Sequence, residues 1–144
     1  MRELDNLVRQ GLLKAEPRDG GEFQGLVSSG RKRLADAHNV ALSPESRFDL
    51  AYNAAHALSL AALRWRGYRP NRQRFLVFQA LQHTLGLKPE EWRILDKAHS
   101  QRNAAEYLGY FDVDQRLLDD VLRITTLVLR RIDELAVTPG GGGP

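Results

Sequence analysis

The chain of 144 residues contains no cysteine, one methionine and two tryptophans. The absence of cysteine excludes disulfide bonds, thiolate metal sites and cysteine nucleophiles. Long hydrophobic runs are also missing, because charged residues interrupt the apolar segments every few positions, and no segment is apolar over the length that spans a bilayer. Residues 1–5 lack the apolar core of a signal peptide. We therefore expect a soluble, cytoplasmic protein without a membrane segment.

The formal net charge is only +3, yet arginine supplies 17 of the 21 cationic side chains. Five of these arginines lie within residues 64–74, interleaved with Trp65 and Tyr68. Arginine offers paired donors that suit phosphate, and aromatic neighbours can stack on bases. The alternative is a solvated helix end, where arginines favour the negative end of the helix dipole. The candidate RNA-binding residues of this segment are Arg64, Arg66, Arg69, Arg72 and Arg74.

The spacing of apolar residues is helical throughout, and no segment shows the alternation of a strand. A length of 144 residues suits one hydrophobic core. The sequence therefore predicts an all-α fold, an antiparallel helical bundle of five to six helices. We expect an N-terminal helix and linker over residues 1–20, the bundle over 21–137 and a disordered glycine-rich tail over 138–144. The expected helices are 2–14, 22–39, 43–66, 71–85, 88–109 and 114–136.

Local signals mark several of these helix ends. Ser43 is suited to cap a helix whose first position is Pro44, and Gly67 follows the expected end of that helix. Gly109 follows the expected end of the helix over 88–109. The last helix has an apolar face that predicts its buried side: Leu117, Leu118, Val121, Ile124, Thr125, Val128 and Ile132.

The helix expected over 88–109 carries a polar stripe where the other helices are apolar. Its residues recur at i, i+3, i+4, i+7, i+8 and i+11, offsets that fall on one face. Such groups lose hydration on burial unless they satisfy one another, a partner or a ligand. The stripe is our candidate functional site, with the solvent side of an amphipathic helix as the alternative. It consists of His99, Arg102, Asn103, Glu106, Tyr107 and Tyr110.

Other chemistries find little support in the sequence. The four histidines lie on four different expected helices without a zinc-ligand spacing, so we expect no metal and no cofactor. His56 lies in an alanine-rich helix and is expected to be a hydrogen-bonded structural histidine. No phosphate-binding glycine loop, nucleophile elbow or basic recognition helix is present.

Three segments together resemble the HEPN superfamily of small helical bundles. Residues 48–56 resemble its alanine-rich second core helix with a tyrosine, here Tyr52. Residues 67–70 and the following 77–81 are similar to its next connection. Residues 102–107, with 109–114, resemble its signature segment. The resemblance covers roughly residues 22–136 and implies the HEPN fold.

Many HEPN proteins are metal-independent ribonucleases of toxin–antitoxin or defence loci, often paired with a nucleotidyltransferase. Their motif is an arginine, a polar residue and, a few residues later, a histidine, and two copies meet across a homodimer. Arg102 and Asn103 match the first two positions, whereas Tyr107 stands at the histidine position. A tyrosine with an ordinary pKa near 10 is a poor base at neutral pH. Tyr110 lies near a tyrosine that the partner enzyme adenylylates in one subgroup, with a spacing one residue longer.

We therefore expect a homodimeric, RNA-binding protein of a toxin–antitoxin or defence-type system, with weak or lost ribonuclease activity. In this hypothesis Arg102, Asn103 and Tyr107 form the catalytic group, and His99, Glu106, Tyr110 and the 64–74 arginines bind RNA or a partner. The alternative is a non-catalytic module whose stripe contacts a second copy or a partner such as a nucleotidyltransferase.

Overall fold

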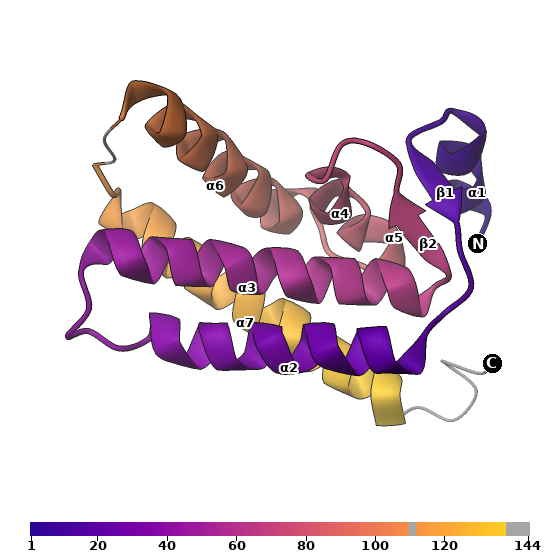
Figure 1. Ribbon diagram of the computed structural model, residues 1–144, viewed down its shortest axis with the longest axis horizontal. Coiled ribbons are helices and arrows are strands. Elements are labelled where there is room, and N and C mark those ends of the chain that lie inside the picture. Colours follow the sequence, from indigo (N-terminus) through magenta and orange to yellow (C-terminus); the bar gives the residue numbers. More distant parts are fainter. Residues whose placement is uncertain (110–111, 138–144) are drawn as a thin grey trace.

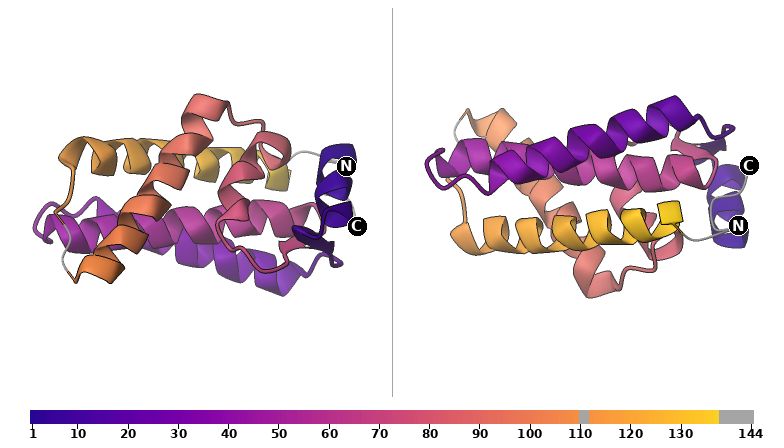
Figure 2. Two further views of the ribbon diagram at one scale, coloured as in Figure 1. Left: turned by 90° about the horizontal axis from the view of Figure 1, so that it is seen from above. Right: turned by 90° about the horizontal axis from the view of Figure 1, so that it is seen from below.

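The computed structural model describes residues 1–109 and 112–137, and it shows a mostly helical bundle (Figure 1). Four long helices form its body: α2 (Gly20–Ala37), α3 (Pro44–Trp65), α6 (Pro89–Leu108) and α7 (Gln115–Val137). Helix α3 lies in the middle and runs antiparallel to α2, while α7 lies behind both (Figure 1). Helix α6 crosses α3 obliquely on the side away from α2 (Figures 1 and 2). The predicted all-α helical bundle is confirmed.

Helix α3 begins where the sequence predicts. The Ser43 hydroxyl accepts the backbone N–H of Ser46 at 3.1 Å, and Pro44 occupies the first turn. Small residues then let α2 approach closely, because a Cβ on Gly30 would lie 2.5 Å from the Leu58 Cγ. Leu58 is fully buried, so α2 and α3 depend on this glycine for their spacing.

Helices α6 and α7 also follow the sequence signals. Gly109 caps α6 with a φ of 78°, a left-handed conformation that glycine adopts readily. In α7 the predicted apolar face is buried along its whole length, which confirms the predicted core face: Leu117, Leu118, Val121, Ile124, Thr125, Val128 and Ile132.

The N-terminal segment differs from its prediction. Helix α1 (Arg2–Arg9) ends well before residue 14, because Gly11 takes a φ of 78° and turns the chain back. The chain then forms β1 (Leu13–Ala15), which pairs antiparallel with β2 (Tyr68–Pro70), Lys14 opposite Arg69. The expectation of no strands was therefore wrong, since three-residue strands are too short to show an alternating pattern. Leu4 and Leu13 are buried and attach this segment to the core.

The predicted helix over 71–85 is also wrong. Two single turns replace it, α4 (Leu76–Gln79) and α5 (Leu81–Thr84), after an irregular loop from residue 71. Three successive residues, Leu76, Val77 and Phe78, are all buried. One face of a regular helix cannot bury three residues in a row, because each residue turns by about 100°. This segment is instead enclosed by α3 and α6, and the turns adapt to both.

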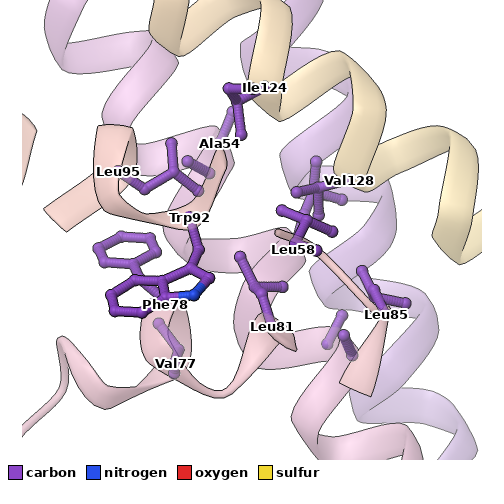
Figure 3. Close-up of a cluster of buried hydrophobic side chains, with 14 of the residues drawn as sticks. Ala54, Leu58, Val77, Phe78, Leu81, Leu85, Trp92, Leu95, Ile124 and Val128 are labelled. Carbon is purple, nitrogen blue, oxygen red and sulfur yellow. The ribbon is translucent and has the colours of Figure 1, made fainter. Parts of the chain in front are cut away.

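The buried cluster in Figure 3 fixes α6 against the rest of the bundle. Trp92 and Leu95 of α6 lie beside Phe78 and Leu81 of the short turns (Figure 3). Behind them, side chains of α3 and α7 complete the cluster (Figure 3). Burial of apolar surface of this kind stabilises the fold by about 25 cal/mol per Å², and it fixes the position of the polar face of α6.

No helix within the described residues is long and apolar enough to cross a bilayer.

Candidate functional site

A cleft of about 670 Å³ opens over α3, between α2 and α6 and beside the loop that precedes α4. Its lining is mainly polar, and Leu26, Ala57 and Leu60 are the aliphatic members. The lining residues come from four segments far apart in the sequence: Leu26 and Arg33; Tyr52, Asn53, His56, Ala57 and Leu60; Arg74; and His99, Arg102, Asn103 and Glu106.

His99 of α6 is held by hydrogen bonds on both ring nitrogens. Its Nδ1 lies 2.8 Å from the Tyr52 hydroxyl, and its Nε2 lies 3.0 Å from the Asn103 side-chain nitrogen. Phe75 also faces the imidazole, with ring centroids 5.4 Å apart. The ring orientation is therefore fixed from α3, from α6 and from the α4 side.

These contacts imply one tautomer of the neutral imidazole. The amide nitrogen of Asn103 is a donor, so Nε2 of His99 accepts, and the ring proton lies on Nδ1 and points to Tyr52. Burial raises the pKa of Tyr52 above its usual value, against the opposing charge of Arg102, so its hydroxyl stays protonated. A ligand that displaces the Asn103 amide would meet the lone pair of Nε2.

Arg102 lies over the face of Tyr52, with its guanidinium carbon 4.8 Å from the ring centroid. Its carboxylate neighbours are more distant than hydrogen-bond partners, Asp49 at 3.6 Å and Glu106 at 3.9 Å. Both carboxylates are mostly exposed, and such exposed pairs contribute little. The guanidinium of Arg102 is thus positioned by the Tyr52 ring and remains able to bind an anion.

His56 lies deeper in the cleft than His99. Burial and then the charge of Arg74 lower the pKa of His56 to about 4, while a hydrogen bond to the Arg74 backbone acts in the opposite direction. Its Nε2 is buried and has no hydrogen-bond partner among the described residues. The ring packs edge-on against Phe78 at 6.0 Å. His56 is therefore neutral at pH 7. Its Nε2 atom is shielded from solvent.

The charges of the cleft favour an anion. Arg33, Arg74 and Arg102 come from three segments, and Glu106 is the one acidic side chain among the lining residues. Arg33 and Arg74 are exposed at the rim. Two histidines, two asparagines and a tyrosine supply further hydrogen-bonding groups. A phosphate group matches this set, because arginine binds its oxygens with paired donors and amides and imidazoles complete the shell.

The chain matches no protein-family model, no curated protein and no solved structure. No group of histidine and carboxylate side chains that could hold a metal ion occurs among the described residues.

The structure separates the members of the polar stripe on α6. His99, Arg102, Asn103 and Glu106 line the cleft together, as one face of one helix requires. Tyr107, in contrast, is 93% exposed and is not among the lining residues. Tyr110 lies outside the described residues. The histidine that lies on the same helix face as Arg102 is His99, one turn before it.

The arginines of residues 64–74 have different surroundings. Arg64 is only 1% exposed and donates to Glu22 at 2.6 Å and to backbone carbonyls that include that of Glu16. Arg69 pairs with the carboxylates of Glu16 and Glu22, and the hydrogen bonds from Arg64 and then from Arg69 lower the pKa of Glu22. Arg66 donates to the Thr84 carbonyl at 3.1 Å. These three arginines hold the N-terminal segment and α5 in place.

Two arginines of this segment remain at the surface. Arg72 is exposed and lies beside Gly11 and Leu12, away from the cleft. Arg74 lines the cleft beside His56. The arginine-rich segment thus contributes one residue to the candidate site.

Tyr52, Asn53 and Arg33 belong to the site although the sequence did not single them out as functional. In the sequence Tyr52 was noted only as the tyrosine of an alanine-rich core helix, and Arg33 was given no role. Tyr52 combines burial at 6% exposure with a polar contact to another helix. The one sequence signal was its hydroxyl on an otherwise alanine-rich face, which needs a hydrogen-bond partner when buried.

Proposed function

We propose that the chain is a HEPN-like protein that binds RNA, with the phosphate backbone seated in the cleft over α3. The observation that carries the proposal is the convergence of Arg33, Arg74 and Arg102 on one cleft that also holds the His99 imidazole. Guanidinium groups bind phosphate oxygens strongly, and exposed amides can contact the sugar or base edges. The sequence resemblance at residues 102–107 supports the same assignment.

The cleft also suits a weak, metal-independent cleavage of RNA. In such a reaction a base removes the proton of the 2′-hydroxyl, the 2′-oxygen bonds to phosphorus, and the bond to the 5′-oxygen breaks as that oxygen takes up a proton from water. His99 Nε2 is the base once the substrate displaces the Asn103 amide from it, and Arg102 beside it would neutralise the phosphate. His56 is neutral and its outer nitrogen is buried, so it is a poor second proton donor. We propose slow cleavage that depends on His99 and not on Tyr107.

We extend the proposal to a toxin–antitoxin or defence-type system, because many HEPN proteins act in such systems. The support is the resemblance of residues 48–56, 67–81 and 102–114 to that superfamily. RNA binding itself is argued from the cleft and can be tested without reference to this context.

The test is a titration of fluorescent single-stranded RNA in EDTA with wild type, Arg102→Gln and Arg74→Gln. We expect each variant to lose roughly tenfold in affinity and to show a shallower dependence on salt. Arg9→Gln, an exposed arginine of α1, is the matched control. Equal RNA affinity of all four proteins would show that the RNA does not bind in the cleft.

The catalytic part needs a separate readout. Gel analysis of RNA incubated at high protein concentration in EDTA should show slow cleavage by wild type and by Tyr107→Phe. His99→Gln should retain most of the binding and lose the cleavage. Cleavage that persists in His99→Gln and disappears in Tyr107→Phe would reverse the assignment.

A second candidate function is a dimer or partner interface, favoured by a different observation. Tyr107 is 93% and Leu108 61% exposed, side by side at the end of α6. Exposed apolar and aromatic groups of this kind are enriched where proteins associate. The partner would be a second copy of the chain or a nucleotidyltransferase. Light scattering of wild type and Leu108→Ser tests the homodimer, since a dimer that uses this surface should dissociate in the variant.

A further inference from the structure

The basic run on α2 extends around the outside of that helix. Arg33 lines the cleft over α3, whereas Arg31 points to α7 and donates to Asp133 at 2.7 Å. Lys32 is exposed, and the 100° step between successive residues places it between the other two. Three consecutive cationic residues thus lead from one flank of α2 to the other.

A second cavity lies on the α7 flank of this helix. It has a volume of about 430 Å³ and opens between the end of α2, the start of α3 and residues 119–130 of α7. Figure 2 (right) shows α2 and α7 as the two helices that border the bundle on this side. Four of the seven lining residues carry cationic or imidazole groups: His38, Arg47, Arg123 and Arg130.

The charges of the second cavity are arranged to receive an anion. Arg47 is held by its Nε, which donates to the Ala37 carbonyl at 2.8 Å. Arg123 has a weak exposed pair with Asp120 at 3.4 Å, and Asp119, the one acidic lining residue, already accepts from Gln115. Exposed pairs of this kind contribute little and can exchange for phosphate.

We propose that one single-stranded RNA occupies both cavities and crosses the outer surface of α2 between them. This inference rests on the proposed function, and it adds the class of RNA: a single strand long enough to pass around a helix. A helix with its side chains is about 10 Å across. A flexible strand can turn around such a support while its phosphates meet Arg33, Lys32 and then the second cavity. A rigid duplex cannot follow that turn.

The test compares a short and a long oligouridylate, of about four and about sixteen nucleotides. The variant is the double substitution Arg123→Gln/Arg130→Gln, which removes two exposed charges from α7 and leaves the cleft over α3 untouched. Arg2→Gln/Arg9→Gln is the matched control, because it removes two exposed charges from α1 at the opposite end of the bundle. Binding is measured by fluorescence anisotropy over a series of salt concentrations in EDTA.

We expect the double variant on α7 to bind the long strand about tenfold more weakly than the control does. Its slope of log affinity against log salt should fall by roughly 0.7 for each phosphate that the variant no longer neutralises, while binding of the short strand stays unchanged. Equal affinity of variant and control for the long strand would overturn the crossing path. If wild type binds neither strand, the proposed function itself fails. If it binds the short strand and the α7 variant changes nothing, only this inference fails.

Discussion

The Tyr52 hydroxyl lies 2.8 Å from Nδ1 of His99. This contact connects α3 to α6 through two residues that are 47 positions apart in the chain. Asn103 donates to the other ring nitrogen, so the two contacts fix one neutral tautomer in which the lone pair of Nε2 faces the Asn103 amide at the cleft. Tyr52 also supports the guanidinium of Arg102 on its ring face. One buried tyrosine therefore positions both groups that we assign to phosphate chemistry.

Tyr52→Phe should separate these two roles. The variant keeps the ring beneath Arg102 and removes the hydroxyl, so RNA affinity should change less than twofold. The His99 ring loses a partner, which should lower the free energy of unfolding by about 1 kcal/mol. Nitrogen NMR should show the Nδ1–H tautomer in both proteins, because Asn103 still donates to Nε2. The ring proton on Nδ1 should exchange with water faster in the variant, because its Tyr52 acceptor is gone. Equal exchange rates in the two proteins would mean that Tyr52 does not position His99.

Glu106→Gln should strengthen RNA binding. Glu106 is the acidic lining residue of the cleft and lies 3.9 Å from Arg102 with 67% exposure. Removal of its charge lowers the repulsion of phosphate and releases Arg102, so affinity should rise about threefold at low salt and less at high salt. Glu90→Gln at the start of the same helix is the control. A weaker complex in Glu106→Gln would show that the carboxylate itself contacts the RNA.

Arg64→Met should destabilise the protein without changing RNA binding. Arg64 is buried and donates to Glu22 and to backbone carbonyls, so its loss leaves buried acceptors without donors. The free energy of unfolding should fall by about 3 kcal/mol in urea denaturation. RNA affinity, measured without urea at a temperature at which the variant is folded, should equal that of wild type. A loss of affinity with unchanged stability would restore Arg64 as an RNA contact.

His56 should make stability depend on pH. Its pKa falls from 6.5 in the unfolded chain to about 4 in the folded protein. Between these values the unfolded chain binds the proton more readily, so stability is fully present above pH 6.5 and falls as pH drops towards 4. The loss attributable to His56 is at most about 3 kcal/mol.

His56→Gln isolates this effect, because it removes the titrating ring and retains polar atoms. Denaturant unfolding at a series of pH values should show a smaller decline between pH 6.5 and 4 in the variant than in wild type. Parallel curves for the two proteins would contradict the burial of a neutral imidazole at this position.

The sequence predicted those parts of the fold that depend on local signals. Ser43, Pro44 and Gly109 mark helix ends because capping is decided by neighbouring residues. The strands at Leu13 and Tyr68 were missed because their pairing joins segments far apart in the chain. The helix expected over 71–85 failed for a related reason, since enclosure by two other helices replaced the regular period.

The candidate site also has one part that local sequence predicts and one part that depends on packing between helices. His99, Arg102, Asn103 and Glu106 could be grouped from the sequence because one helix carries all four. Tyr52 and Arg33 join them only through the packing of α2 and α6 against α3, which a single sequence does not specify. Residues 64–74 show the reverse case, because three of the expected phosphate ligands, Arg64, Arg66 and Arg69, make contacts within the fold.

The central claim, that the cleft over α3 receives RNA phosphate, is tested most directly by NMR on a labelled sample with an added short oligouridylate in EDTA. We predict that the side-chain signals of Arg102, Asn103 and His99 shift together with one dissociation constant, while those of Arg9 remain unchanged. Shifts confined to residues outside the cleft, or none at saturating RNA, would contradict it.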